Sequence, residues 1–224
     1  MSHPMLKPVA AFGLAVCVLL TAPLSALAQS APGSPASPPA ATEPDRPPYV
    51  SIKGRESTHE DGIIKLTIFL DFFCGHCHKF DTTVVPLLQK EYGDKLQVTY
   101  VGMPIVDRQA SPIPVIAYYL ADAQGKGDVM RDLLFSYIWD LRLDVTKPDY
   151  LLAIADKAGL DLEAFKRGFN EGTMLDRLEE GKKTGQAIGL RGTPTLLIDN
   201  HLRINDISMR SLEAIFSEVL EGKV

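Results

Sequence analysis

The strongest apolar pattern beyond the first fifty residues is the run IIKLTIFLDFF, residues 63–73. Apolar and β-branched residues dominate it, and this composition predicts a strand that is buried on both faces of a sheet. Apolar residues then recur at helical spacing, at Phe80, Val84, Leu87 and Leu88. The pattern therefore predicts a strand followed directly by a helix, with Cys74 at their junction.

A second strand is predicted after this helix. Residues 96–101, LQVTYV, alternate between apolar and polar side chains. Gly93 is expected to end the intervening helix, and Pro86 to kink that helix or to start its second half. A strand, a helix and a strand in so short a space make a βαβ unit, in which the two strands run parallel.

The pattern between residues 106 and 190 is helical. Apolar residues at i, i+3, i+4 and i+7 spacing form two clear runs, Met130, Leu133, Leu134, Tyr137, Ile138 and Leu151, Ile154, Ala155, Ala158. Gly159 is expected to end one helix, and Asp161 to cap the N-terminus of the next. We therefore expect a block of helices here, with its aromatic side chains in the core.

The pattern returns to strands near the end of the chain. Residues 195–198, TLLI, predict a short strand, and a turn at 200–201 leads to a second one that pairs antiparallel with it. An amphipathic helix over residues 212–220 follows, capped by Asp206 or Ser208. The predicted order is βαβ, a helical block and ββα, which is an α/β fold.

The first residues have the pattern of an export signal. An uncharged apolar run covers residues 9–20, and Ala26-Leu27-Ala28 has the small-x-small pattern that signal peptidase accepts. We expect residues 1–28 to be a signal peptide that is cleaved after Ala28, with an uncleaved membrane anchor as the alternative. Cys17 lies within the signal and would be removed with it.

Domain organisation follows from composition. Residues 29–48 are rich in proline and lack an apolar period, which predicts a disordered tether. The remainder, 49–224, has the length of one domain. Within it we expect residues 49–105 and 191–224 to form the sheet-containing core and 106–190 a helical insertion. The formal charge of −5 and the lack of basic runs argue against a nucleic-acid partner, and we expect a monomer.

The candidate chemistry lies in Cys74-Gly75-His76-Cys77. A thiol at the start of a helix faces free backbone N–H groups and the positive end of the helix dipole, which favour the reactive thiolate. The C-x-x-C spacing places Cys77 one turn further on, where it can resolve a mixed disulfide. A partly protonated imidazole at His76 would stabilise the thiolate of Cys74 further, and so make the disulfide more oxidising.

Two other sites use similar spacings. With His78 the motif becomes C-x-x-C-H, the spacing that attaches a c-type haem, with His78 as an axial ligand. The strand before Cys74 and the helix after it favour a dithiol, and His78 is then interpreted as a solvent-facing helix residue. Structural zinc needs four ligands, and Cys74, Cys77 and one histidine fall short. We expect no cofactor and no metal.

Two separate motifs resemble DsbA-type thiol-disulfide oxidoreductases of the thioredoxin-like superfamily. The residues CGHCHKF, with Phe80 and Pro86 after them, resemble the active-site helix of that family, and LRGTPTLLIDN at 190–200 resembles its cis-proline loop. The resemblance covers nearly all of residues 49–224 and implies a thioredoxin-like fold with a helical insertion between its two halves.

The resemblance also implies roles for individual residues. Cys74 would be the exposed nucleophile and Cys77 the buried resolving thiol. Pro194 would be a cis-proline that faces the disulfide, and Thr193 would offer backbone hydrogen bonds to an extended substrate segment.

The sequence departs from the best-known oxidants of this family at three points. Gly75-His76 replaces Pro-His between the cysteines and resembles protein disulfide isomerases. Thr193 before the proline resembles bacterial isomerases of the DsbC kind. Ile68 stands where many thioredoxin-like proteins have a buried acid, and Asp71 is the nearest acid, so a proton-relay role for Asp71 is not supported.

The export signal, the C-x-x-C motif at a helix start and His76 favour a periplasmic oxidant that transfers the disulfide of Cys74 and Cys77 to exported cysteine-containing proteins. It would be reset by a membrane oxidant like DsbB. The alternative is an isomerase or reductase, kept reduced by a membrane reductant like DsbD, and Gly75 and Thr193 favour it. Two further hypotheses remain: a c-type haem electron carrier, and a thioredoxin-like binding module without turnover.

Overall fold

The computed structural model describes residues 47–224, and the predicted signal peptide and residues 29–46 of the predicted tether lie outside this part. One sheet contains five strands in the order β1-β5-β4-β2-β3. The strands are β1 (Tyr49–Ser51), β2 (Ile64–Leu70), β3 (Leu96–Gly102), β4 (Thr195–Ile198) and β5 (Leu202–Ile204). β2 and β3 are parallel and every other neighbouring pair is antiparallel, which confirms the predicted βαβ and ββα halves.

The central strand β2 has two unequal faces. One face is fully buried and carries Ile64, Leu66, Ile68 and Leu70. On the other face Phe69 is buried, but Lys65 and Thr67 are half-buried, so the prediction of burial on both faces is only half correct. The helix on that face is α7 (Leu175–Ala187), and the apolar cluster there consists of Phe69, Met103, Ile188 and Leu197, so Lys65 and Thr67 are not part of it.

The helix after Cys74 is made of three successive segments. They are α1 (Gly75–Lys79), a π-helical turn η1 (Phe80–Val84) and α2 (Val85–Tyr92). Pro86 stands in the first turn of α2, where its missing N–H is tolerated, and the wider turn η1 precedes it. The predicted start of a second half at Pro86 and the predicted end at Gly93 are both confirmed.

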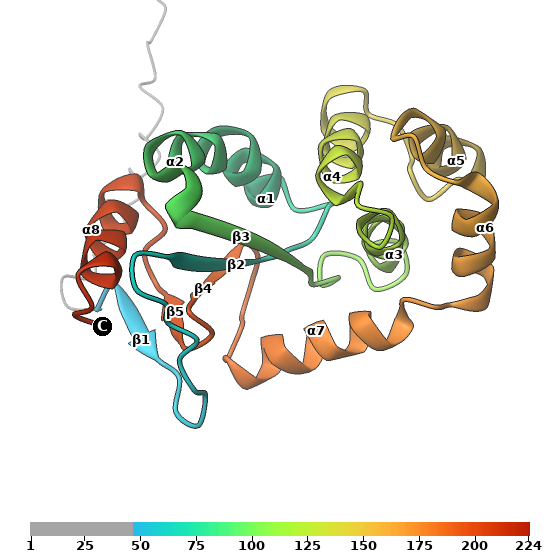
Figure 1. Cartoon of the computed structure of the whole chain (residues 1–224). Coiled ribbons are helices and arrows are strands. Elements are labelled where there is room, and N and C mark those ends of the chain that lie inside the picture. Colours follow the sequence, from blue (N-terminus) through green and yellow to red (C-terminus); the bar gives the residue numbers. More distant parts are fainter. Residues whose placement is uncertain (1–46) are drawn as a thin grey trace, which may run out of the picture. The chain divides into compact units, whose positions relative to one another are not determined.

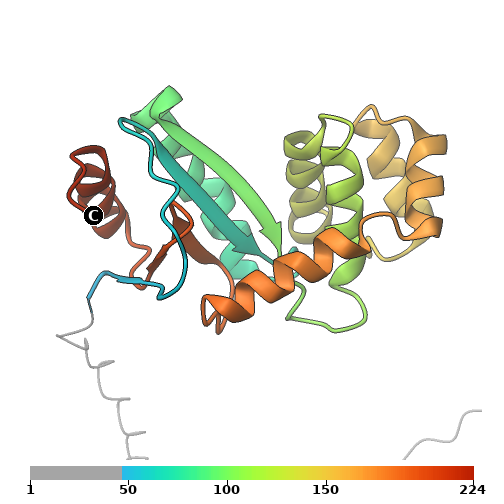
Figure 2. The same cartoon turned by 60° about the horizontal axis from the view of Figure 1, so that its bottom comes forward.

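Five helices and one π-helical turn form the insertion between β3 and β4 (Figure 1). They are α3 (Pro112–Asp122), α4 (Gly127–Phe135), η3 (Ser136–Asp140), α5 (Pro148–Lys157), α6 (Leu162–Glu171) and α7. Helices were expected from residue 106, but the first one, α3, begins at Pro112, and residues 103–111 form a loop. Figure 2 shows α3 to α6 grouped beside the sheet, while α7 crosses back toward it.

Helix caps agree with the sequence. Asp161 accepts hydrogen bonds from the backbone N–H groups of Glu163 and Ala164, and Ser208 caps α8 (Met209–Leu220). α8 packs beside α2, where the ring of Phe216 meets that of Tyr92. These contacts fix both helices on the same face of the sheet as α1 (Figure 1).

Strand β1 lies within the predicted core but was not predicted as an element, and Pro47 and Pro48 were assigned to the tether. β1 pairs antiparallel with β5, and the carbonyls of Pro47 and Pro48 accept hydrogen bonds from Asn205. The folded part therefore includes the last two residues of the predicted tether. A three-residue strand is too short to produce an alternation that a sequence pattern can reveal.

Candidate active site

Cys74 stands at the N-cap of α1, directly after the sheet. β2 ends at Leu70, and a tight turn follows in which the N–H of Cys74 donates to the carbonyl of Asp71 at 3.0 Å. Cys74 itself has extended backbone angles, φ −87° and ψ 112°, and its carbonyl accepts the first helical hydrogen bond, from His78. Cys74 is therefore the N-cap residue, at the end of the helix where backbone N–H groups are free and favour negative charge, although its side chain makes no capping hydrogen bond.

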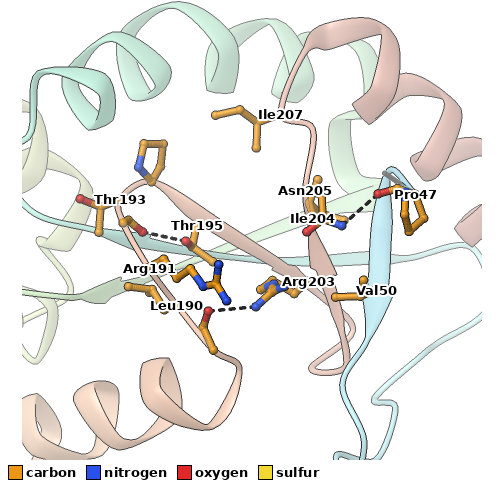
Figure 3. Close-up of a pocket in the computed structure, with 13 residues that line it drawn as sticks. Pro47, Val50, Leu190, Arg191, Thr193, Thr195, Arg203, Ile204, Asn205 and Ile207 are labelled. Carbon is orange, nitrogen blue, oxygen red and sulfur yellow. Dashed lines mark hydrogen bonds between the residues drawn. The ribbon is translucent and has the colours of Figure 1, made fainter. Parts of the chain in front are cut away.

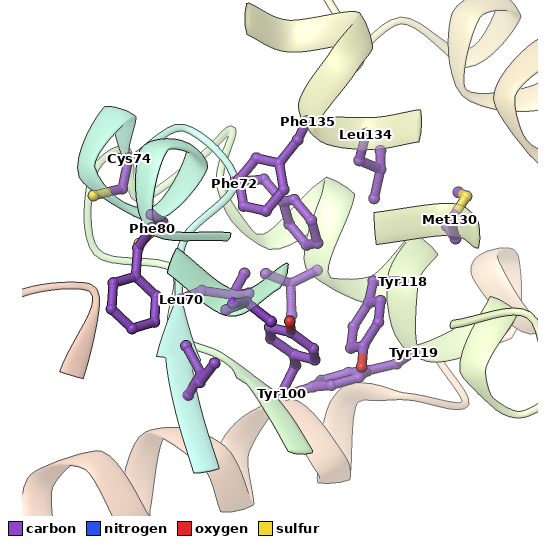
Figure 4. Close-up of a cluster of buried hydrophobic side chains, with 14 of the residues drawn as sticks. Leu70, Phe72, Cys74, Phe80, Tyr100, Tyr118, Tyr119, Met130, Leu134 and Phe135 are labelled. Carbon is purple, nitrogen blue, oxygen red and sulfur yellow. The ribbon is translucent and has the colours of Figure 1, made fainter. Parts of the chain in front are cut away.

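The two cysteines are free thiols in this structure and differ in burial. Cys77 is 2% exposed and Cys74 is 9% exposed, so the expectation of an exposed Cys74 is too strong, although Cys74 is the more accessible of the two. Cys74 lies at the edge of the apolar cluster that also contains Phe72 and Phe80 (Figure 4). Burial raises the pKa of the Cys77 thiol well above its ordinary value, which keeps Cys77 protonated at neutral pH.

The second motif, far along the chain, meets the first at Cys74. The peptide bond between Thr193 and Pro194 is cis, as the resemblance implied. The thiol of Cys74 donates to the carbonyl oxygen of Thr193 at 3.1 Å, which joins residues 119 positions apart. Thr195 fixes the same loop, because its hydroxyl donates to the carbonyl of Gly192 at 2.7 Å.

The two histidines of the motif have different surroundings. His76 is exposed between the two cysteines. His78 is not the solvent-facing residue that the helix pattern indicated: its side chain is only 23% exposed, and its ring stacks on Trp139 with 5.6 Å between centroids and an interplanar angle of 7°. A further ring contact joins His78 to Phe135. These contacts hold the His78 ring, which the haem alternative requires as an axial ligand, against the helical insertion.

Trp139 from η3 covers the start of the active-site helix. Its indole N–H donates to the carbonyl of Phe72 at 2.9 Å. A Cβ atom added at Gly75 would lie 3.1 Å from Cη2 of Trp139, closer than most side chains tolerate. The glycine between the cysteines thus has a local packing reason, which the sequence alone did not reveal.

Asp71 holds the loop that follows β3. Its side chain is fully buried, and Oδ1 accepts from the N–H of Phe73 at 2.9 Å. Oδ2 accepts from Ile105 at 2.8 Å and from Val106 at 2.9 Å. Asp71 is therefore a loop anchor beside the cysteines. The sequence signal for this was an aspartate at the end of a strand, since Asp side chains commonly bond to backbone N–H groups in turns.

Within residues 47–224, no group of three or more His, Cys, Asp or Glu side chains is arranged to hold a metal ion. None of the helices in this part of the chain has the length and apolar character needed to cross a membrane.

Comparison with known proteins gives a consistent picture. The model of the DSBA-like thioredoxin domain family matches residues 65–216. The thiol:disulfide interchange protein DsbA of Pseudomonas aeruginosa is 21% identical over 157 residues, which are 70% of this chain and 73% of that protein. A probable disulfide bond formation protein D of Bacillus anthracis is 24% identical over 148 residues, 64% of this chain and 68% of that protein. The crystal structure of the oxidoreductase DsbA from Xylella fastidiosa has the same fold, with a TM-score of 0.65, 18% identity and coverage of 78% of this chain and 94% of that one.

Proposed function

Because this chain belongs to the DSBA-like thioredoxin domain family of thiol-disulfide oxidoreductases, we propose that it is a dithiol oxidant of exported proteins. In this proposal it donates the disulfide between Cys74 and Cys77 to substrates that carry reduced cysteines. Substrates react with the sulfur of Cys74, since Cys74 is more accessible than Cys77 and lies against the loop of Thr193 and Pro194.

The reaction is an exchange of one disulfide for another. A substrate thiolate attacks the sulfur of Cys74, the bond between Cys74 and Cys77 breaks, and Cys77 leaves with the electron pair and takes up a proton. The second substrate thiolate then attacks the substrate sulfur of this mixed disulfide and releases Cys74 as a thiolate. Two electrons pass from the substrate to the protein, which ends as the dithiol.

The observation that carries the proposal is the contrast between the two sulfurs. Only a thiolate attacks a disulfide, and burial raises the pKa of Cys77, so Cys77 is rarely a thiolate at neutral pH. Return attack by Cys77 on the mixed disulfide is therefore slow, so the second substrate thiol has time to resolve it and to complete the transfer of the disulfide.

Other residues of the site have supporting roles in the proposal. The exposed imidazole of His76, when protonated, stabilises the thiolate of Cys74 and so makes the disulfide more oxidising. The carbonyl of Thr193, beside Pro194, accepts from the Cys74 thiol only in the dithiol form, so in the disulfide form it is free to pair with an extended substrate segment.

The cellular setting belongs to the same proposal. The apolar run at residues 9–20 and the Ala26-Leu27-Ala28 site support export to the periplasm, where the folded domain acts as a monomer after cleavage at Ala28 or from a retained anchor. A membrane oxidant like DsbB restores the disulfide after each transfer.

An isomerase or reductase, kept reduced by a membrane partner like DsbD, is the second candidate, and Thr193 favours it. Gly75 favours it less than the sequence indicated, because packing against Trp139 accounts for a glycine there. Alkylation trapping of the thiols in growing cells separates the two candidates. The oxidant is expected mainly as the disulfide, and a protein found mainly as the dithiol would reverse the assignment.

A further inference from the structure

A basic pocket adjoins the loop that contacts Cys74. Its volume is about 540 Å³, within the range typical of ligand sites, and thirteen residues line it, including Thr193 and Pro194. The side chains of Arg191 and Arg203 both extend into it (Figure 3). In the proposed function a substrate segment bonded to Cys74 pairs with Thr193, which is itself part of the pocket wall.

The positive charge of this pocket has no acidic counterpart in its wall. None of the thirteen lining residues is Asp or Glu, although the chain as a whole carries a formal charge of −5. Nη1 of Arg203 donates to the carbonyls of Ile188 and Gly189, at 2.7 and 2.9 Å, and these neutral acceptors orient the guanidinium without cancelling its charge. The carboxylate of Asp206, next to the wall residues Asn205 and Ile207, lies outside the wall and accepts from the N–H and the hydroxyl of Ser208 at the start of α8; these neutral donors hold it there and leave its charge in place.

We propose that this pocket binds an acidic side chain of the substrate polypeptide, close to the cysteine that reacts with Cys74. The inference rests on the proposed function and adds a substrate preference to it: cysteines with Asp or Glu nearby are oxidised faster than those with neutral or basic neighbours. Arg191 is the principal determinant, because it is exposed and lies two residues before Thr193. Arg203 adds charge at the same place from β5.

The experiment uses the oxidised protein and reduced peptides that carry two cysteines and differ only in flanking residues: Asp, Ser or Lys. Oxidation is followed by acid quenching and mass spectrometry. Flanking charge also alters the intrinsic reactivity of the peptide thiols, so the quantity compared is the Asp-to-Ser rate ratio in wild type divided by the same ratio in Arg191→Gln. This quotient removes the contribution of the peptide itself. The matched control is Arg167→Gln, an equal charge change at an exposed position of α6 that is not part of the pocket wall.

We expect the Asp-to-Ser ratio to fall about two- to five-fold in Arg191→Gln, the size of an exposed ion pair, and to stay unchanged in Arg167→Gln. The difference should shrink in about 1 M salt, where exposed charges are screened. Equal ratios in wild type and Arg191→Gln, with the Ser peptide still oxidised, would overturn the preference and leave the proposed function intact. If none of the three peptides is oxidised, the proposed function itself is overturned.

Discussion

Replacement of Asp71 by asparagine tests how the loop beside the reactive cysteines is held. The carboxylate accepts three backbone N–H groups, from Phe73, Ile105 and Val106, at 2.8 to 2.9 Å in a fully buried position. Asparagine preserves the volume but exchanges one accepting oxygen for an NH₂ group. With its oxygen toward Ile105 and Val106, its NH₂ group faces the N–H of Phe73, and donor then meets donor.

The size of the effect follows from these three bonds. A hydrogen bond to a charged acceptor contributes about 1.5 to 3 kcal/mol, and a neutral one about 0.5 to 1.5 kcal/mol. The variant loses one charged bond and weakens two. Part of this loss is offset because the buried amide, unlike the carboxylate, gives up no solvation of a charge on folding. We therefore expect the free energy of unfolding to fall by about 2 kcal/mol.

Urea unfolding of the reduced protein measures this loss, and hydrogen exchange locates it. The amides of Ile105 and Val106 should exchange faster in Asp71→Asn, since their acceptor is weakened. Asp94→Asn makes the same chemical change at an exposed position and should alter stability by less than about 0.5 kcal/mol. A similarly small change in Asp71→Asn, or unchanged exchange at the two loop amides, would refute the anchoring role.

Two further outcomes are expected from the same site. Gly75→Ala places a Cβ atom 3.1 Å from Trp139 and should lower the free energy of unfolding by about 1 kcal/mol, measured in urea; no relief when Trp139→Phe is added would contradict the packing argument. Burial raises the pKa of Cys77 from its ordinary value of 9.0, so the folded reduced protein keeps a proton that the unfolded chain releases. Stability of the reduced form should therefore fall above pH 9 by about 1.4 kcal/mol per pH unit relative to Cys77→Ser, and parallel pH profiles of the two proteins would exclude this.

Most of the fold could be predicted from the sequence because its main elements have a long apolar pattern or a distinct residue at one end. β2 has a dense apolar pattern, Asp161 and Ser208 are good capping residues, and Gly93 ends a helix. Each of these signals is local, so a single sequence contains it. The failures come from tertiary context: whether Lys65 is buried depends on how far α7 extends under the sheet, which no local pattern encodes.

The candidate site was predicted unevenly for the same reason. The C-x-x-C motif and the loop at Pro194 are recognisable as sequences, and the structure brings them together at Cys74. The position of Trp139 over Gly75 depends instead on the packing of the helical insertion against the active-site helix. The prediction that His78 faces solvent was wrong because the helix pattern contains no information about the insertion, whose Trp139 stacks on the His78 ring.

The most direct test of the central claim is the reduction potential of the Cys74 and Cys77 pair. Purified protein is equilibrated with glutathione buffers of defined ratio, and the dithiol fraction is read by alkylation and mass spectrometry. The account predicts a disulfide clearly more oxidising than that of glutathione, with a less oxidising value when His76 is replaced. A potential equal to or more reducing than that of glutathione would contradict the assignment as an oxidant.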